Sequence, residues 1–259
     1  MTPAELPDIV HRLTAIVIFA VGMGMIAVHT VLAMAAPQST RARRAPFLVA
    51  AAVGAYLTLW FSLAIAVGDR TNFPLEHEGS RLWLSLLVGF GPMFVGIAML
   101  FVSKAIRQLN AAMPAQWLIW AQSYRMAGLM FLFPFLYYGV VPAAFAIPAA
   151  VGDFVTGALA PLAGLAVARR RPNAIRWATA WNLFGMLDLI VAPAAAVLSQ
   201  AHVIGLYPLS LVPLFIGPPL GILTHVYSLR NLATLSSSAV AGASHPKNGT
   251  TIGATFRPA

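Results

Sequence analysis

Residues 174–198, AIRWATAWNLFGMLDLIVAPAAAVL, decide the fold class of this 259-residue chain. A helix that crosses a membrane needs about 20 mostly apolar residues. This stretch meets that length, and its only charged residues are Arg176 and Asp188. It has no polar stripe at a period of 3.6 residues, which a soluble amphipathic helix would have. The stretch therefore predicts a transmembrane helix that carries one carboxylate at membrane depth.

Similar runs occupy most of the chain. Hydrophobic residues make up 59% of it and charged residues only 9%, whereas about a quarter of the residues in a soluble domain are charged. We therefore expect an all-α, polytopic transmembrane bundle that forms a single domain over residues 1–235. Residues 236–259 are rich in Ser, Gly, Ala and Thr and predict a disordered cytoplasmic tail. The seven predicted helices lie near 9–35, 46–67, 82–102, 115–141, 148–168, 174–198 and 207–229.

Basic residues alternate between the connections that join these runs. The first, third and fifth connections and the C-terminal tail hold twelve basic residues and no acidic one, whereas the opposite side holds three basic and five acidic residues. Because short cytoplasmic loops carry the excess of Lys and Arg, we expect the N-terminus outside and the C-terminus in the cytoplasm. The twelve are Arg41, Arg43, Arg44, Lys104, Arg107, Arg169, Arg170, Arg171, Arg176, Arg230, Lys247 and Arg257.

The net charge of +9 would also suit a protein that binds nucleic acid. Because the excess lies on one side of the membrane, we interpret it as a topology signal that contacts the lipid bilayer, and we expect no nucleic-acid partner. The chain has no Cys, which excludes disulfides and thiolate metal sites. It has no complete motif of a zinc protease, a serine hydrolase or a P-loop ATPase. The sequence therefore assigns no enzyme class and no metal site.

Three charged residues, Arg125, Asp153 and Asp188, lie inside predicted helices. Charged groups at membrane depth cost about 2.5 to 3.5 kcal/mol each and usually face the interior of the bundle. At a rise of about 1.5 Å per residue, both carboxylates lie within reach of the flexible Arg125 side chain. We therefore predict that Arg125 pairs with Asp188 or with Asp153.

Uncharged polar residues of the same region, Gln122, Tyr124 and Asn182, are expected to complete this polar core. Two hypotheses about its role remain open. The polar core binds or passes a small solute or a proton, or it only holds helices together in a non-transporting subunit, sensor or assembly partner. A homo-oligomer or a larger membrane complex is compatible with either hypothesis.

Two histidines, His29 and His225, raise the alternative that the protein binds a haem cofactor. His29 in the first predicted helix and His225 in the last both fall near the cytoplasmic end when depth is counted along the helices. Two His at one level are able to ligate haem b from both sides. Interfacial His residues more often cap a helix or extend toward water, so we expect no cofactor and keep haem b as the alternative.

A set of scattered residues extends through the predicted helices from 115 onward. The set consists of Gln122-x-Tyr124-Arg125-x-x-Gly128, Phe131-Leu132, Pro142-x-x-Phe145-Ala146-x-Pro148, Gly152-Asp153, Gly157, Ala160-Pro161, Trp181-Asn182-x-x-Gly185-x-x-Asp188 and His225-x-x-Ser228-Leu229. These residues resemble those of a group of uncharacterised bacterial multi-pass, seven-helix inner-membrane proteins. The resemblance implies a bacterial inner (cytoplasmic) membrane protein, and it carries no activity and no catalytic residue with it.

Overall fold

The computed structural model describes residues 8–35, 44–69, 78–136, 139–201, 203 and 206–243. Over these ranges the chain is helical and forms no strand. Six of the described helical segments are long and apolar enough to cross a membrane, because each offers the 20 or so apolar residues that a bilayer requires. The predicted all-α bundle of a membrane protein is therefore confirmed.

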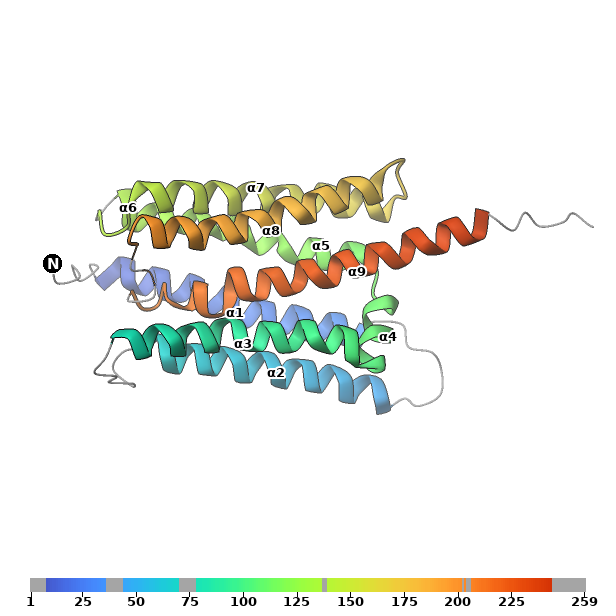
Figure 1. Cartoon of the computed structure of the whole chain (residues 1–259), viewed down its shortest axis with the longest axis horizontal. Coiled ribbons are helices and arrows are strands. Elements are labelled where there is room, and N and C mark those ends of the chain that lie inside the picture. The colour runs from blue at the N-terminus through green and yellow to red at the C-terminus, as the bar shows by residue number, and fades with distance from the viewer. Residues whose placement is uncertain are drawn as a thin grey trace, which may run out of the picture.

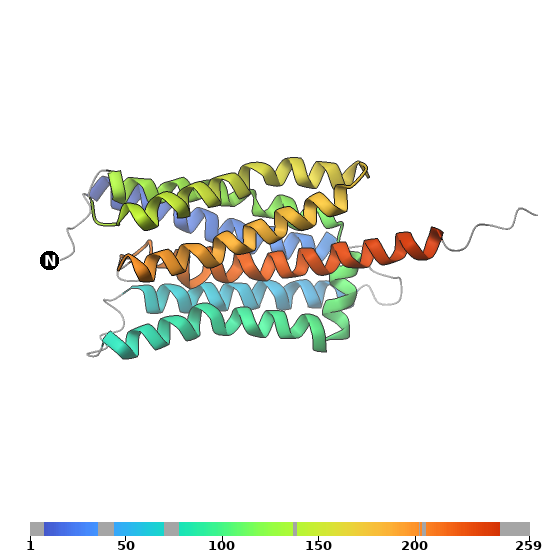
Figure 2. The same cartoon turned by 45° about the horizontal axis from the view of Figure 1, so that its top comes forward.

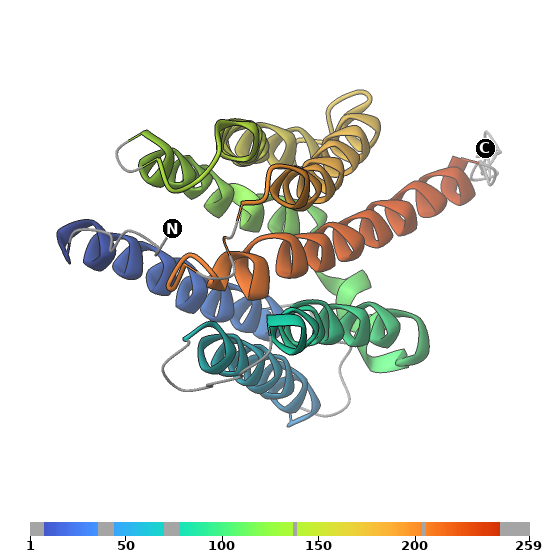
Figure 3. The same cartoon turned by 60° about the vertical axis from the view of Figure 1, so that its left-hand side comes forward.

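The helices pack in two groups on either side of the last one (Figure 1; Figure 3). The first group contains α1 (Asp8–Ala35), α2 (Arg44–Gly68) and α3 (Glu78–Val102). The second contains α5 (Ala115–Ala121), η1 (Gln122–Phe131), α6 (Leu132–Leu136), α7 (Ala143–Ala168) and α8 (Ala174–Leu198). Between them runs α9 (Pro218–Ala243). In the most apolar 18-residue stretch of residues 212–237, 72% is buried inside the bundle, against 17–33% in the corresponding stretches of the other five spans. Helix α9 is therefore the central helix.

Successive spans run in opposite directions, and the N-terminal end of α1 and the C-terminal end of α9 lie at opposite ends of the bundle (Figure 1). The connections that hold Lys104, Arg107 and Arg169–Arg171 lie together at the end toward which α9 runs. We call this end the basic end. The predicted assignment of this end to the cytoplasm stays a prediction. Arg41, Arg43, Lys247 and Arg257 lie outside the described residues.

A short helix that we did not expect, α4 (Lys104–Ala112), lies across the basic end (Figure 2). The Ser103 hydroxyl accepts a hydrogen bond from the Ile106 amide and caps the helix N-terminus, as Ser commonly does. The amide of Asn231 on α9 donates to the carbonyls of Asn110 and Met113 at 2.5 and 2.8 Å. These bonds attach α4 and the turn after it to the central helix.

The span predicted as one helix at 115–141 is divided into three segments and ends at Leu136. Its middle segment, η1, is a 3₁₀-helix of ten residues, although such runs rarely exceed four. With three residues per turn, positions spaced by three share a face, and the buried residues of η1 have that spacing. They are Gln122, Arg125, Gly128 and Phe131.

The last span also differs from the predicted range 207–229. It begins with a π-helical turn, η3 (Val212–Ile216), which the bond from the Gly217 amide to the Val212 carbonyl closes at 2.8 Å. The following helix, α9, continues to Ala243, so residues 236–243 of the predicted disordered tail are helical, and the rest of the tail lies outside the described residues. The Ala residues of this stretch favour a helix.

Two further helices begin earlier than predicted. The helix predicted at 82–102 begins at Glu78. The helix predicted at 148–168 begins at Ala143, because the Pro142 carbonyl already accepts bonds from the amides of Phe145 and Ala146 at 3.0 and 2.9 Å. Pro148 and Pro161 are accommodated within this helix. Helix α8 has the predicted bounds.

Candidate functional site

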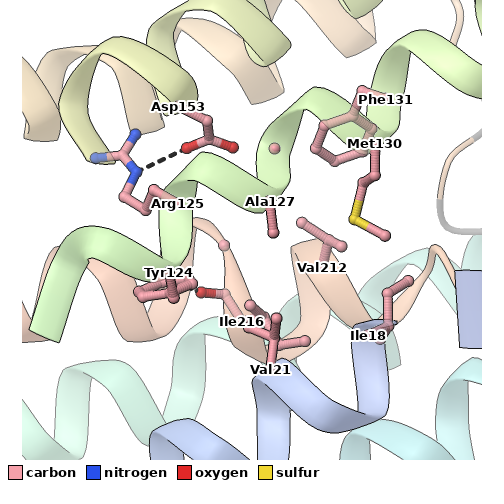
Figure 4. Close-up of a pocket in the computed structure, with 12 residues that line it drawn as sticks. Ile18, Val21, Tyr124, Arg125, Ala127, Met130, Phe131, Asp153, Val212 and Ile216 are labelled. Atoms are coloured by element: carbon pink, nitrogen blue, oxygen red, sulfur yellow. Dashed lines mark hydrogen bonds and ion pairs between the residues drawn. The ribbon is translucent and has the colours of Figure 1, made fainter. Parts of the chain in front are cut away.

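Arg125 is the centre of a buried ion cluster in the second group of helices. Its side chain is 1% exposed. The Nε of Arg125 donates to Asp153 Oδ1 on α7 at 2.7 Å (Figure 4), and one terminal nitrogen, NH2, pairs with Asp188 Oδ2 on α8. We expected a pair with one aspartate or the other, and the structure has both.

His225 of α9 completes this cluster. The other terminal nitrogen of Arg125, NH1, lies 3.2 Å from His225 Nε2 and donates to the Gly185 carbonyl at 3.1 Å. Asn182 fixes the tautomer of the imidazole, because its amide nitrogen donates to the Ala178 carbonyl at 2.8 Å and its oxygen therefore faces His225 Nδ1 at 2.9 Å. Nδ1 thus carries the proton and Nε2 accepts from Arg125. We call Arg125, Asp153, Asp188 and His225 the Arg125 cluster.

Glycines at three positions make room for the cluster. A side chain at Gly128 would collide with Asp153, and one at Gly152 would collide with Asp188. At Gly185 a Cβ atom would lie 2.6 Å from His225 Nε2. Such close approach of helix backbones is the usual role of small residues in membrane helices. The glycines therefore allow three helices to bring their polar groups to one guanidinium.

The charges of the cluster do not cancel. With both carboxylates ionised and the imidazole neutral, the single positive charge of Arg125 faces two negative charges. An uncompensated charge inside a bundle is costly, because the surroundings solvate it poorly. One bound proton would make the cluster neutral.

A small cavity adjoins Asp153 (Figure 4). Its volume is about 30 Å³, which is room for about one or two water molecules. Asp153 Oδ1 binds Arg125, whereas Oδ2 lies on the side of Gly128, which lines the cavity. The cavity is partly open and is lined by side chains of α1, η1 and η3, among them Ile18, Val21, Tyr124, Phe131, Val212 and Ile216.

Unpaired polar atoms lie on the other side of the cluster. Thr156 follows Asp153 by three residues on α7, and Ser228 follows His225 by three on α9, and both helices run toward the basic end. Gln122 precedes Arg125 by three residues on η1, which runs away from that end. Buried polar atoms without a protein partner usually bind ordered water. The unpaired atoms among the described residues are Asn110 Oδ1, Gln122 Oε1, Thr156 Oγ1 and Ser228 Oγ.

Two of the predicted core residues do not contact the ions. The Gln122 amide donates to the Gly221 carbonyl at 3.0 Å, and the Tyr124 hydroxyl donates to the Ile216 carbonyl at 2.6 Å. Gln122 therefore attaches η1 to α9, and Tyr124 attaches it to the π-helical turn η3. Asn182 acts through His225.

The two histidines do not fit a haem. His29 bonds the Met25 carbonyl at 2.8 Å and the Thr224 hydroxyl at 3.1 Å, and both ring nitrogens of His225 face protein partners. Neither imidazole can therefore ligate an iron atom without losing a hydrogen bond. No group of three or more His, Asp or Glu that could hold a metal occurs within the described parts of the chain.

His225 is the site residue that sequence reasoning misplaced. Depth counted at 1.5 Å per residue from Tyr207 put it near the cytoplasmic end, but residues 206–217 include turns and a π-helical segment rather than an α-helix. The spacing of His225, Ser228 and Asn231 by three residues was the available signal, because it marks one polar face on an otherwise apolar helix.

Fold and cluster together define a class, that of helical membrane proteins with a buried ion cluster. A family model described as "Domain of unknown function (DUF8737)" matches residues 82–233. The match covers more than half of the chain and contains the whole Arg125 cluster, and the protein belongs to this family. No curated protein and no solved structure matched the chain. The function must therefore be argued from the site.

Proposed function

We propose that this protein binds a proton at the Arg125 cluster and moves it across the membrane. The observation that carries the proposal is one buried guanidinium facing two carboxylates and a neutral imidazole. A proton is favoured over a larger solute because the adjoining cavity has a volume of only about 30 Å³. From the resemblance and the charge distribution we further propose that the membrane is the bacterial inner membrane.

In this proposal Asp153 is the group that takes up and releases the proton. Asp153 lines the cavity and its side chain is 15% exposed, against 10% for Asp188. Its Oδ2 lies away from Arg125, beside Gly128. Water in the cavity would connect this oxygen with the end of the bundle at which α1 begins, since most of the η1 residues that line the cavity follow Arg125 in the direction of α6.

On the other side, the unpaired atoms of Thr156, Gln122 and Ser228 would hold the waters that carry the proton toward the basic end. Arg125 stays charged throughout, because guanidinium does not lose its proton in proteins. Its role is to hold both carboxylates and to separate the two water-filled regions.

Proton flux into vesicles tests the proposal. Purified protein is reconstituted into liposomes that enclose a pH-sensitive dye, and a potassium diffusion potential is applied. Wild type should acidify the lumen, Asp153→Asn should do so no faster than protein-free vesicles, and Asp153→Glu should keep part of the rate because it keeps a carboxyl group. Arg176→Gln, at an exposed position of α8, should behave as wild type. Equal rates for Asp153→Asn and wild type would refute the role of Asp153.

A second candidate is a non-transporting subunit, sensor or assembly partner in which the cluster only holds helices together. This candidate is favoured because Arg125 is almost fully hydrogen-bonded. Four of its five N–H donors have protein partners. No flux through wild-type protein, together with a stoichiometric partner on purification from native membranes, would favour this candidate.

A further inference from the structure

A long apolar groove lies on the surface between α1 and the α5–η1 segment. Its volume is about 680 Å³, within the range of 300 to 1,000 Å³ that is usual for a small-molecule site. One wall consists of residues of α1, and Trp117, Trp120, Ala121 and Tyr124 form the other wall. The residues of α1 are Val21, Gly24, Met25, Val28, Val31, Leu32 and Ala35.

The groove has a length and an apolar lining that suit an extended hydrocarbon chain. Its α1 residues follow one another at steps of three or one, which places them in a stripe along one helix face. From Val21 to Ala35 this stripe is about 21 Å long at a rise of 1.5 Å per residue. Every group in the lining other than the tips of Trp117, Trp120 and Tyr124 is apolar.

We propose that this groove binds one acyl chain of an anionic phospholipid. The α1 wall belongs to a helix that is long and apolar enough to cross a membrane, so lipid chains are the apolar molecules that would reach the groove. Leu32 lies at the basic end of the groove. It packs against a group of buried apolar side chains that includes Leu109 of α4 and Met113, which follows α4. Helix α4 carries Lys104 and Arg107, whose charges attract an anionic headgroup.

The acyl chain then runs from this end toward Val21 and Tyr124. These two residues line both the groove and the cavity beside Asp153, so the bound chain would cover the lipid-facing side of that cavity. A second copy of this protein is the other candidate occupant, and it would bury the same stripe of α1.

Gly24 provides the test. It lines the groove, and a Cβ atom placed on it would meet nothing within 4 Å. A larger side chain there fills the groove without colliding with the protein, and replacing Gly by Leu also favours the helix. Ala27 is an exposed residue of the same helix that does not line the groove, and Ala27→Leu is therefore the matched control.

The experiment is native mass spectrometry of the whole protein, purified in a mild detergent and mixed with phosphatidylglycerol or phosphatidylcholine. Wild type should retain one phosphatidylglycerol molecule in preference to phosphatidylcholine. Gly24→Leu should weaken this binding about tenfold, the change expected when two methylene groups lose their contacts, and Ala27→Leu should leave it unchanged. Circular dichroism and the melting temperature verify that both variants fold.

Equal lipid binding by Gly24→Leu and Ala27→Leu would overturn the proposal, as would wild-type protein that retains no phospholipid. A dimer that dissociates in Gly24→Leu would replace the lipid with a second copy. The inference does not rest on proton transfer, because lipid binding is measured without any flux.

Discussion

Arg125 contacts two carboxylates, one carbonyl and one imidazole from three different helices. Its replacement by Met would leave the side chains of Asp153 and Asp188 without their positively charged partner, and breaking a buried ion pair in this way costs about 3–5 kcal/mol. We therefore expect Arg125→Met to lower the free energy of unfolding by that amount, as measured by denaturation in detergent. Arg176→Met, at an exposed position, should have little effect.

A double-mutant cycle separates this ion network from general packing. Asp188→Asn in the Arg125→Met background should cost less than in wild type, because the carboxylate has already lost its partner. The same should hold for Asp153→Asn. Additive effects in both cycles would mean that the contacts in the structure contribute no coupling free energy.

The glycines beside the cluster give a second prediction for single residues. Gly152→Ala places a methyl group against the Asp188 carboxylate, and overpacking of this kind costs about 1–3 kcal/mol. The melting temperature should therefore fall. Gly24→Ala has open space and should leave the melting temperature unchanged or raise it. A Gly152→Ala protein as stable as wild type would contradict the close approach of α7 and α8.

At this scale the sequence predicted the charged residues of the site but not all their partners. The depths of Asp153 and Asp188 could be counted because α7 and α8 are regular α-helices. His225 could not be placed in that way, because the segment before α9 is irregular. The carbonyl of Gly185 carries no signal in sequence at all.

At the scale of elements, η1 is the segment whose geometry most directly positions the site. If η1 has three residues per turn, lipid exposure should repeat every third residue, as the exposed Met126 and Leu129 and the buried Gly128 and Phe131 indicate. The natural chain contains no Cys, so single Cys residues at positions 122–131 can each carry a nitroxide label. Oxygen accessibility of the labels should have a period of three, and a period of 3.6 would contradict the 3₁₀ assignment.

The apolar pattern predicted that the chain crosses the membrane here but not how its backbone is hydrogen-bonded. Hydropathy depends on side chains, and 3₁₀, α and π segments of one composition are equally apolar. The same reason explains why the π-helical turn before α9 was missed.

At the scale of the whole molecule, the charge distribution predicts the orientation in the membrane. A membrane-impermeant thiol reagent added to intact cells should label Gln200→Cys, in the turn after α8 at the end opposite the basic end, and should not label Arg171→Cys. Arg171→Cys should react only after the membrane is opened. The reverse labelling pattern would mean that the basic end faces outward. The two ends of the proposed proton path would then exchange sides of the membrane.

Seven apolar runs were sufficient to predict a helical bundle with its ends on opposite sides. The central place of α9 could not be predicted, because all the runs are apolar and none has a strong preference for lipid or protein. Buried polar residues such as Asn231 and Ser228 were the only hint that this helix is surrounded by protein.

If the Arg125 cluster is neutral, one of its two carboxyl groups carries a proton. Infrared spectroscopy of the protein in lipid, with ¹³C in the side-chain carboxyl of Asp, measures this directly, because only a protonated acid has the C=O stretching band. Wild-type protein should show such a band at neutral pH, and the band should shift in D₂O and be lost in Asp153→Asn. Wild-type protein without this band, with both aspartates ionised, would contradict a neutral cluster.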